Sequence, residues 1–279
     1  MDELTGRLNA ICDAQPFDTA WYLKDLATGR EAHRGGHDVL PSASTRKTSI
    51  MMAVFRAVHA GRLDLAEPVL IEERLKKDVA SGTYRYMTAG CTIPLRDAVV
   101  NMIITSDNVC TQILLERLDE AELNAYCREI GMRGSVHRGK IPRLGLDFDH
   151  PAEAVATTTA ADQGLLLDLI LRGMEDEDAA ARLGVSTALC RLAMDILSWQ
   201  LLRQLIPSLL PYGTKVAHKT GRGRRGRMDA GIVFRNGRPL YILTAYTDRV
   251  PETMPDGLPG YAAAFTTVGK LSRTCWDAL

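Results

Sequence analysis

Strand-like segments lie at both ends of this chain of 279 residues, and helical patterns fill the middle. Near the N-terminus, TAWYLKDLATGREAHR alternates in polarity and is interrupted at Thr28-Gly29, which predicts a hairpin. Near the C-terminus, TKVAHKTG, MDAGIVFRNG and RPLYILTAYTD predict three further strands, and Asn236-Gly237 joins the last two. This segregation favours an α+β fold in which both ends of the chain build one antiparallel sheet of about five strands.

Apolar residues recur at helical spacing between these segments, and most of the runs end at glycine or another residue typical of a helix terminus. We expect a helix at each end of the chain and others over 44–60, 94–104, 108–118, 120–130, 159–172 and 187–204, with Trp199 in the core. The predicted architecture is a single domain over 1–279 in two lobes: 1–43 with 213–279 as an α/β lobe, and 44–212 as an all-α lobe. A cleft between two lobes is a usual place for a small-molecule site.

The balance of charge argues against a nucleic-acid or membrane surface. Lys and Arg together number 34, as do Asp and Glu, so no net field attracts a polyanion. No stretch is apolar for long enough to cross a membrane, and the first residues, MDELTGRLNAICDA, do not resemble a signal peptide. The six cysteines lack metal-ligand spacing. We expect no metal, no cofactor and a cytoplasmic location, or a periplasmic or secreted one if a signal sequence was removed.

Ser44 and Lys47 lie three positions apart at the start of an apolar run, LPSASTRKTSIMMAVFRAV, so they share one face of a helix. A serine needs a base to become a nucleophile. A lysine can serve as that base when burial lowers its pKa, and the apolar residues after Lys47 favour such burial. Taken alone, the pair is better explained by a helix cap and a solvated lysine.

Two further motifs follow. The segment 106–108, Ser-Asp-Asn, interrupts an apolar pattern, either as a helix cap or to carry a hydroxyl and an amide into the cleft. The segment 219–221, Lys-Thr-Gly, ends a strand, with His218 expected to point away from Lys219. The arginine-rich run that follows would suit nucleic acid, but it lacks interleaved aromatic residues.

Together these motifs, S-x-x-K, S-D-N and K-T-G in this order, form the signature of class A β-lactamases and penicillin-binding proteins. The chain resembles that superfamily, nearest to class A, over nearly its whole length. TTTAAD (157–162) resembles the end of the family's omega loop, and DAGIVF resembles the strand after its K-T-G strand. The resemblance implies a β-lactamase/transpeptidase-like fold and an acyl-enzyme formed with an amide, β-lactam or ester.

The resemblance also implies a role for each motif residue. Ser44 would attack the carbonyl, Lys47 would take its proton, and Ser106 would pass it to the leaving nitrogen. The backbone N–H groups of Ser44 and Arg222 would form the oxyanion hole. A small substrate that bears a carboxylate would contact Asn108, Lys219, Thr220 and Gly221, with Arg225 or Arg227 adding to the carboxylate site and Tyr84 forming a lip.

One residue of the class A pattern is missing. In that class an omega-loop glutamate, in an E-x-x-x-N context, activates the water that hydrolyses the acyl-enzyme. Lys140-Ile141-Pro142 stands at this place, and Asp147, Asp149 and Glu153 are out of register. We therefore expect slow hydrolysis of β-lactam acyl-enzymes. The alternatives are a D-Ala-D-Ala-type peptidase or acyltransferase, a non-catalytic β-lactam-binding protein, and a nucleic-acid-binding protein.

Overall fold

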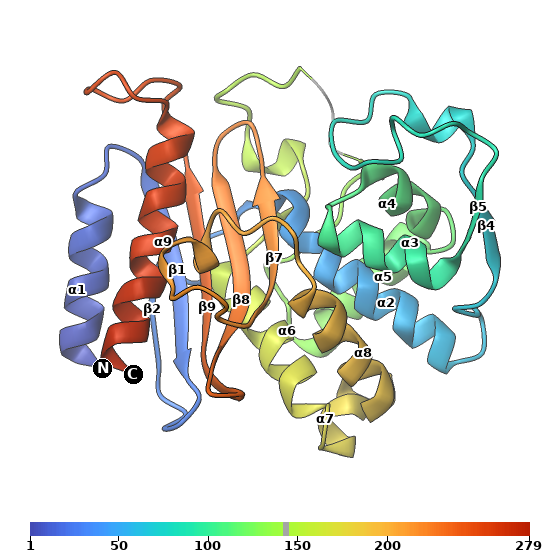
Figure 1. Ribbon diagram of the computed structural model, residues 1–279, viewed down its shortest axis with the longest axis horizontal. Coiled ribbons are helices and arrows are strands. Elements are labelled where there is room, and N and C mark those ends of the chain that lie inside the picture. The colour runs from blue at the N-terminus through green and yellow to red at the C-terminus, as the bar shows by residue number, and fades with distance from the viewer. Residues whose placement is uncertain (142–144) are drawn as a thin grey trace.

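The two ends of the chain form one antiparallel five-stranded sheet, which confirms the prediction (Figure 1). The computed structural model describes residues 1–141 and 145–279. The strand order is β2-β1-β9-β8-β7, with bounds β1 (Asp18–Asp25), β2 (Glu31–Arg34), β7 (Val216–Arg222), β8 (Arg227–Arg235) and β9 (Arg238–Asp248). Asn236 and Gly237 have φ values of 53° and 78°, as the tight hairpin between β8 and β9 requires.

Helices cover both faces of this sheet. The terminal helices α1 (Asp2–Asp13) and α9 (Gly260–Ala278) lie side by side on one face, where apolar residues of both pack with Trp21 and Leu23 (Figure 1). On the other face lies α6 (Ala160–Arg172). A Cβ at Gly164 would come within 2.4 Å of the Tyr22 ring, so glycine permits the close contact between α6 and β1.

The middle of the chain is helical, as predicted, and encloses a large apolar core. Its helices are α2 (Lys47–His59), α3 (Leu95–Ile104), α4 (Asn108–Leu115), α5 (Glu120–Ile130), α7 (Glu177–Arg182) and α8 (Thr187–Ser198). Short elements connect them: η1 (Ala43–Arg46), η2 (Glu73–Lys76), η3 (Ala152–Ala154), η4 (Ile206–Leu209), and the strand pairs β3 (Leu40–Pro41) with β6 (Thr157–Thr158) and β4 (Pro68–Leu70) with β5 (Thr92–Pro94). The sequence did not predict α7, which has fewer than two turns. The division into two lobes remains a prediction.

The structure corrects two expectations near α8. The helix predicted over 187–204 ends at Ser198, because the chain turns there and buries Gln200, whose Nε2 donates to the carbonyl oxygen of Ile103 (2.9 Å). Trp199 was expected in the core, but it is 44% exposed and its ring lies near the guanidinium of Arg96. The side chain that the turn buries is therefore the polar glutamine and not the tryptophan.

Three global features bear on function. Among the described residues, no helix has the length and hydropathy of a membrane span. All six cysteines are free thiols. Within 1–141 and 145–279, no group of His, Cys, Asp and Glu side chains is arranged to hold a metal ion.

Candidate active site

Ser44 lies on the short 3₁₀ helix η1, beside the edge strand β7. A Cβ at Gly221 would come within 3.2 Å of the Ala43 Cβ, so glycine allows this approach. Ala43 itself has a φ of 43°, an uncommon left-handed conformation. The prediction that Ser44 and Lys47 share the first turn of an α-helix needs correction, since α2 begins only at Lys47.

The turn that carries Ser44 is held from two sides. Ser42 donates from both its backbone N–H and its Oγ to the carbonyl oxygen of Ala156, at 2.9 Å each. Thr45 Oγ1 donates to the carbonyl oxygen of Ser42 (2.6 Å) and also contacts the Tyr246 hydroxyl on β9 (2.9 Å). These bonds fix the position of Ser44, which is half-buried, before any substrate arrives.

Lys47 is only 2% exposed, and its Nζ atom directly contacts two residues of the Ser-Asp-Asn motif. Nζ lies 2.8 Å from the carbonyl oxygen of Ser106, 3.2 Å from Ser106 Oγ and 2.7 Å from Asn108 Oδ1. Two of these oxygens can only accept, whereas the hydroxyl can also donate, so a neutral amine satisfies all three contacts. No hydrogen bond joins Lys47 Nζ to Ser44 Oγ within the described residues. The amine of Lys47 is thus hydrogen-bonded to Ser106, and not to Ser44, in this structure.

The surroundings of Lys47 favour its neutral form. Burial lowers the pKa of Lys47 well below its ordinary value, and the positive charges of Lys219 and Arg46 lower it further. The carboxylate of Asp107 and the Cys110 thiol act in the opposite direction but are outweighed. A lysine in this state can accept a proton near neutral pH, as a general base must.

The 106–108 loop serves both as a cap and as a site. Asp107 caps α4, because Oδ1 accepts from the N–H of Cys110 (3.0 Å) while Oδ2 accepts from the N–H of Tyr84 (2.9 Å). Ser106 is buried with a φ of 56°, and Asn108 begins the helix. Asp107 therefore orients the two residues that contact Lys47. Tyr84 is half-buried beside this loop, and its role as a lip remains a prediction.

Lys219, Thr220 and Gly221 lie near the end of β7, the edge strand next to η1. Lys219 is fully buried and donates to the carbonyl oxygen of Thr220 (2.8 Å). Burial lowers the pKa of Lys219 to about 7, although the nearby carboxylate of Asp229 opposes this shift. Arg222 ends the strand and its side chain is exposed, which leaves it at the rim of the site.

His218 has a partner other than Lys219, in keeping with the alternation of side chains along β7. Its Nδ1 lies 3.0 Å from both carboxylate oxygens of Asp229 on β8, and both side chains are completely buried. One of these oxygens also accepts from the N–H of Ile206 (3.1 Å). Sequence reasoning missed Asp229, although a lone carboxylate in an apolar strand is itself a sign of a buried partner.

The two arginines predicted to bind a substrate carboxylate hold the β7–β8 hairpin. Arg225 is buried, with Nε and Nη2 on the carboxylate of Asp248 and Nη1 on the carbonyl oxygen of His150. The protein itself satisfies this guanidinium, and a contact of Arg225 with substrate remains a prediction. Arg227 donates from Nη1 to carbonyl oxygens within 223–226 (2.8 and 2.9 Å), and its contact with substrate remains a prediction.

The resemblance puts the missing glutamate at 140–142, and this register remains a prediction. The Lys140 side chain is exposed and lies 3.6 Å from the carboxylate of Glu116, while Pro142 falls outside the described residues. The side chains of Asp147, Asp149 and Glu153 are exposed, and none of them hydrogen-bonds to Lys47 within the part of the chain that the structure describes.

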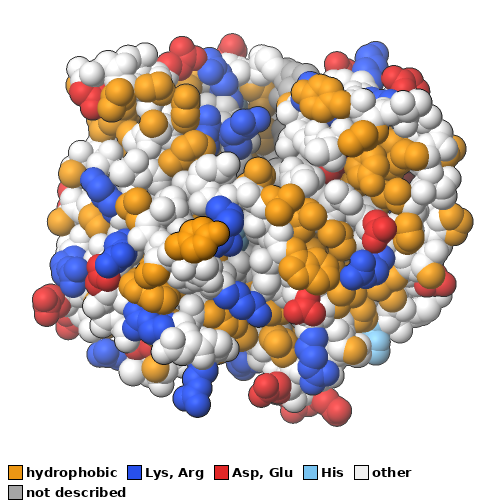
Figure 2. All heavy atoms as spheres, in the orientation of Figure 1, with side chains coloured by type: hydrophobic (Ala, Val, Ile, Leu, Met, Phe, Trp, Pro, Cys, Tyr) orange, Lys and Arg blue, Asp and Glu red, His pale blue; other side chains and the backbone are white. Residues whose placement is uncertain are grey.

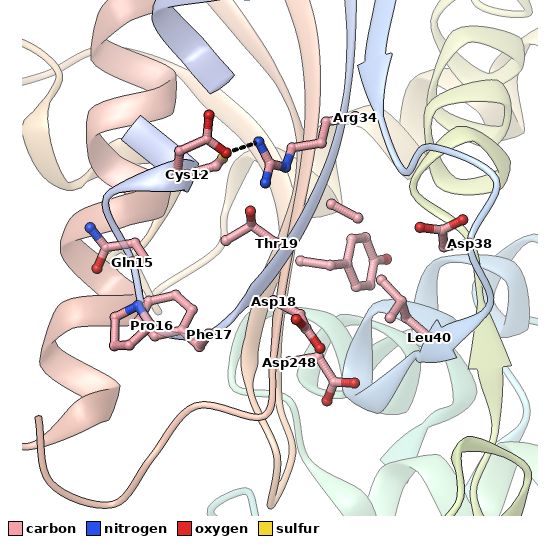
Figure 3. Close-up of a pocket in the computed structure, with 13 residues that line it drawn as sticks. Cys12, Gln15, Pro16, Phe17, Asp18, Thr19, Arg34, Asp38, Leu40 and Asp248 are labelled. Carbon is pink, nitrogen blue, oxygen red and sulfur yellow. Dashed lines mark hydrogen bonds and ion pairs between the residues drawn. The ribbon is translucent and has the colours of Figure 1, made fainter. Parts of the chain in front are cut away.

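A separate cavity of about 490 Å³ lies between the end of α1 and the start of β1 (Figure 3). Its lining includes Asp18, Asp38 and Asp248, and Arg34 pairs there with Asp13 at 2.6 Å. None of the motif residues lines it. Four aspartates and one arginine line this cavity, whereas Lys47 and Lys219 are both buried among the motif residues. We therefore place the candidate active site at Ser44.

Comparison with known proteins agrees with this geometry. The chain matches the Beta-lactamase enzyme family over residues 3–279. The structure of PBP-A is 26% identical, with a TM-score of 0.83, and the match covers 100% of this chain and 96% of that chain. A point mutant of PBP-A, in an acyl-enzyme complex with penicillin G, is 27% identical with a TM-score of 0.82 and the same coverage. A β-lactamase from Chitinophaga pinensis has the same fold, with a TM-score of 0.85 at 20% identity and 99% of each chain covered. The chain therefore belongs to the β-lactamase enzyme family.

Proposed function

We propose that this protein forms an acyl-enzyme through Ser44 with an amide, β-lactam or ester that bears a carboxylate. The observation that carries the proposal is the buried Lys47 amine, which contacts Ser106 and Asn108 and lies beside the charge of Lys219. Ser44 Oγ attacks the carbonyl carbon while its proton passes to Lys47. The backbone N–H groups of Ser44 and Arg222 donate to the oxyanion.

The leaving group departs by a second proton transfer. Lys47 returns the proton through the Ser106 hydroxyl, 3.2 Å away, to the leaving nitrogen or oxygen as its bond to the acyl carbon breaks. Lys219 and Thr220 bind the substrate carboxylate. Support for acylation by a β-lactam comes from the PBP-A mutant, which was captured with penicillin G as an acyl-enzyme at 27% identity to this chain.

Hydrolysis of a β-lactam acyl-enzyme should be slow. By the sequence resemblance, Lys140 begins the stretch where class A enzymes carry the glutamate that activates water, and its ammonium lies 3.6 Å from the carboxylate of Glu116. General-base catalysis typically contributes a factor of about 100 to 10,000, so the loss turns a fast β-lactamase into a slow one. Smaller acyl groups leave room for water to approach Lys47, so an ester or linear amide should turn over faster than a penicillin.

A peptidase or transpeptidase of the D-Ala-D-Ala type is the second candidate. The missing carboxylate favours it, because an amine can accept the acyl group without an activated water. Nucleic-acid binding has less support. Arg224 pairs with Glu252 at 2.8 Å, Arg225 pairs with Asp248, and the face in Figure 2 carries basic and acidic side chains interspersed.

A chromogenic cephalosporin, stopped-flow kinetics and intact-mass spectrometry test the proposal together. We expect an adduct on Ser44, a burst of product about equal to the enzyme concentration, and then a slow steady rate. The Ser44→Ala protein should show neither adduct nor burst. Labelling of Ser44→Ala, or no labelling of the natural chain by β-lactams, activated esters and D-amino-acid peptides, would contradict the proposal. A single fast phase would contradict slow deacylation, and an adduct that never turns over with any of these donors would indicate a binding protein.

A further inference from the structure

Arg46 is a buried arginine between the candidate nucleophile Ser44 and the candidate base Lys47. Its residue is only 4% exposed. The guanidinium donates from Nη1 to the carbonyl oxygen of Gly139 (3.1 Å) and more weakly to that of Arg138 (3.4 Å), and from Nη2 to that of Lys140 (2.7 Å). One side chain therefore ties the turn of Ser44 to the segment that holds the place of the missing glutamate.

Other bonds fix the far side of the same segment. The N–H of Gly139 donates to Glu120 Oε2 (2.8 Å), and the N–H of His137 donates to Asn124 Oδ1 (2.7 Å). Both acceptors lie on α5. From α2, Ser49 Oγ contacts His137 Nε2 (3.0 Å) and donates to the carbonyl oxygen of Arg46 (2.8 Å). Residues 137–140 are thus clamped between α5 and the start of α2, and Arg46 supplies the contact nearest the serine.

Arg46 also brings a fixed charge next to Lys47. Burial lowers the pKa of Arg46 to about 10, with Glu120 opposing, so the guanidinium stays cationic at neutral pH. Its hydrogen-bond partners are neutral carbonyls, and no carboxylate among the described residues bonds to it. Burial and the charge of Arg46 together lower the pKa of His137 to about 3, so that ring is neutral and adds no second positive charge beside the guanidinium.

The charged and titratable groups that face Lys47 come from several elements. Lys219 on β7 and Arg46 at the end of η1 disfavour its ammonium form, while Asp107 and the Cys110 thiol favour it. Of the two cations, only Arg46 cannot lose its charge near neutral pH, because Lys219 has a pKa of about 7. Arg46 therefore supplies the positive charge that persists at neutral pH and keeps the pKa of Lys47 low.

We propose that Arg46 is a positioning residue of the Ser44 site: it clamps residues 138–140 to the turn of the nucleophile and holds a permanent positive charge beside Lys47. The inference rests on the proposed function, since it assigns Arg46 to the support of the acylating base. The two contributions are separable. A lysine at 46 breaks the clamp because it lacks the planar fork that reaches the three carbonyls, and a methionine of similar length removes both the clamp and the charge.

The test compares Arg46→Lys and Arg46→Met with the natural chain and with Arg138→Met. Arg138 is a matched control, because it is a half-buried arginine of the same segment that donates instead to the carbonyl oxygen of Val155 (3.0 Å) and to Thr157 Oγ1 (3.1 Å). Three measurements are made: titration of Lys47 by ¹³C NMR, hydrogen exchange of the 137–140 amides, and the pH profile of acylation by a chromogenic cephalosporin.

In Arg46→Met we expect the Lys47 titration and the acidic limb of acylation to move to higher pH by about one unit, which lowers acylation below that limb about tenfold. Exchange of the 137–140 amides should accelerate in both Arg46 variants. In Arg138→Met the Lys47 titration should stay at its natural position, and in Arg46→Lys it should move no further than in Arg46→Met. If the Lys47 titration does not move in Arg46→Met, the claim that the charge of Arg46 lowers the pKa of Lys47 is wrong. If hydrogen exchange of the 137–140 amides is unchanged in both Arg46 variants, the claim that Arg46 clamps this segment is wrong.

The titration and the exchange do not require activity, so they decide the inference even if no substrate acylates Ser44. Absence of acylation in the natural chain would overturn the proposed function alone. A folded Arg46→Lys protein keeps the clamp testable if Arg46→Met does not fold.

Discussion

The titration of Lys219 should make acylation depend on pH in a way that distinguishes charged from uncharged substrates. Lys219 is fully buried near Ser44, and burial lowers its pKa to about 7. Below that pH it is an ammonium ion that attracts a carboxylate, and above it becomes a neutral amine. The second-order rate constant of acylation reports the free enzyme, so this pKa should appear directly in its profile.

The size of the effect follows from the lost charge. At pH 8, one unit above the pKa, about a tenth of the molecules still carry the ammonium, so the rate for a carboxylate-bearing donor falls about tenfold per unit. A hydrogen bond to a charged group is worth ~1.5–3 kcal/mol, so the fall should level off ~10- to 150-fold below the plateau. An ester without a carboxylate should show no such fall.

The assay measures acylation of the same enzyme by a chromogenic cephalosporin and by an uncharged activated ester between about pH 5 and about pH 9. Lys219→Arg keeps its charge throughout this range, so it should abolish the basic limb for the cephalosporin. Lys219→Met should stay at the low plateau at every pH. A basic limb of equal depth for both substrates, or its persistence in Lys219→Arg, would show that another group titrates.

Three further outcomes are expected. Lys47→Arg should acylate no faster than Lys47→Ala, both by orders of magnitude slower than the natural chain in stopped-flow labelling, because a guanidinium does not release its proton at working pH. Lys219→Met should raise the free energy of unfolding at pH 7 by at most ~5 kcal/mol. The reason is that the pKa of Lys219 is about 7 in the native state and 10.5 in the unfolded state, so the unfolded state binds more protons between these two pH values. That gain should vanish near pH 10.5, and urea denaturation showing equal gains at both pH values would contradict it. Asp107→Ala should lower the free energy of unfolding by ~1–3 kcal/mol, as it removes the cap of α4 and the acceptor of the Tyr84 N–H, and a circular-dichroism melt unchanged from the natural chain would refute that role.

Features with a local signal were predictable from the sequence. The Asn236-Gly237 turn and the alternation of β1 fixed two hairpins, and the order of the three motifs located the site. Within the site, Asp107 matched its cap signal, and His218 has its partner on β8 as alternation along the strand implied. In each case a few adjacent residues carry enough information, because turn geometry, capping and strand alternation are local properties.

Features that depend on contacts between distant segments were not predictable. The sequence analysis did not single out Arg46 and assigned Arg225 to a substrate carboxylate, yet both are buried, with partners 92 to 94 residues away for Arg46 and 23 and 75 residues away for Arg225. The contact of Lys47 with Ser106 depends on a positive φ at a serine, which residue type alone does not indicate. The prediction that Trp199 lies in the core was wrong. It relied on the large apolar ring of Trp199, whereas the turn after α8 buries the side chain of the neighbouring Gln200.

The two lysines of the site have different surroundings, and the difference explains how one can be a base while the other attracts an anion. Burial and the positive charges of Lys219 and Arg46 disfavour the ammonium form of Lys47, so its neutral amine can act as the base. Once neutral, it no longer adds positive charge near Lys219, whose pKa is then set by burial against the carboxylate of Asp229. With Lys47 neutral and Lys219 protonated, the site holds one amine and one ammonium. This is the state that acylation by a carboxylate-bearing substrate requires, and a bound carboxylate stabilises it further by favouring the Lys219 cation.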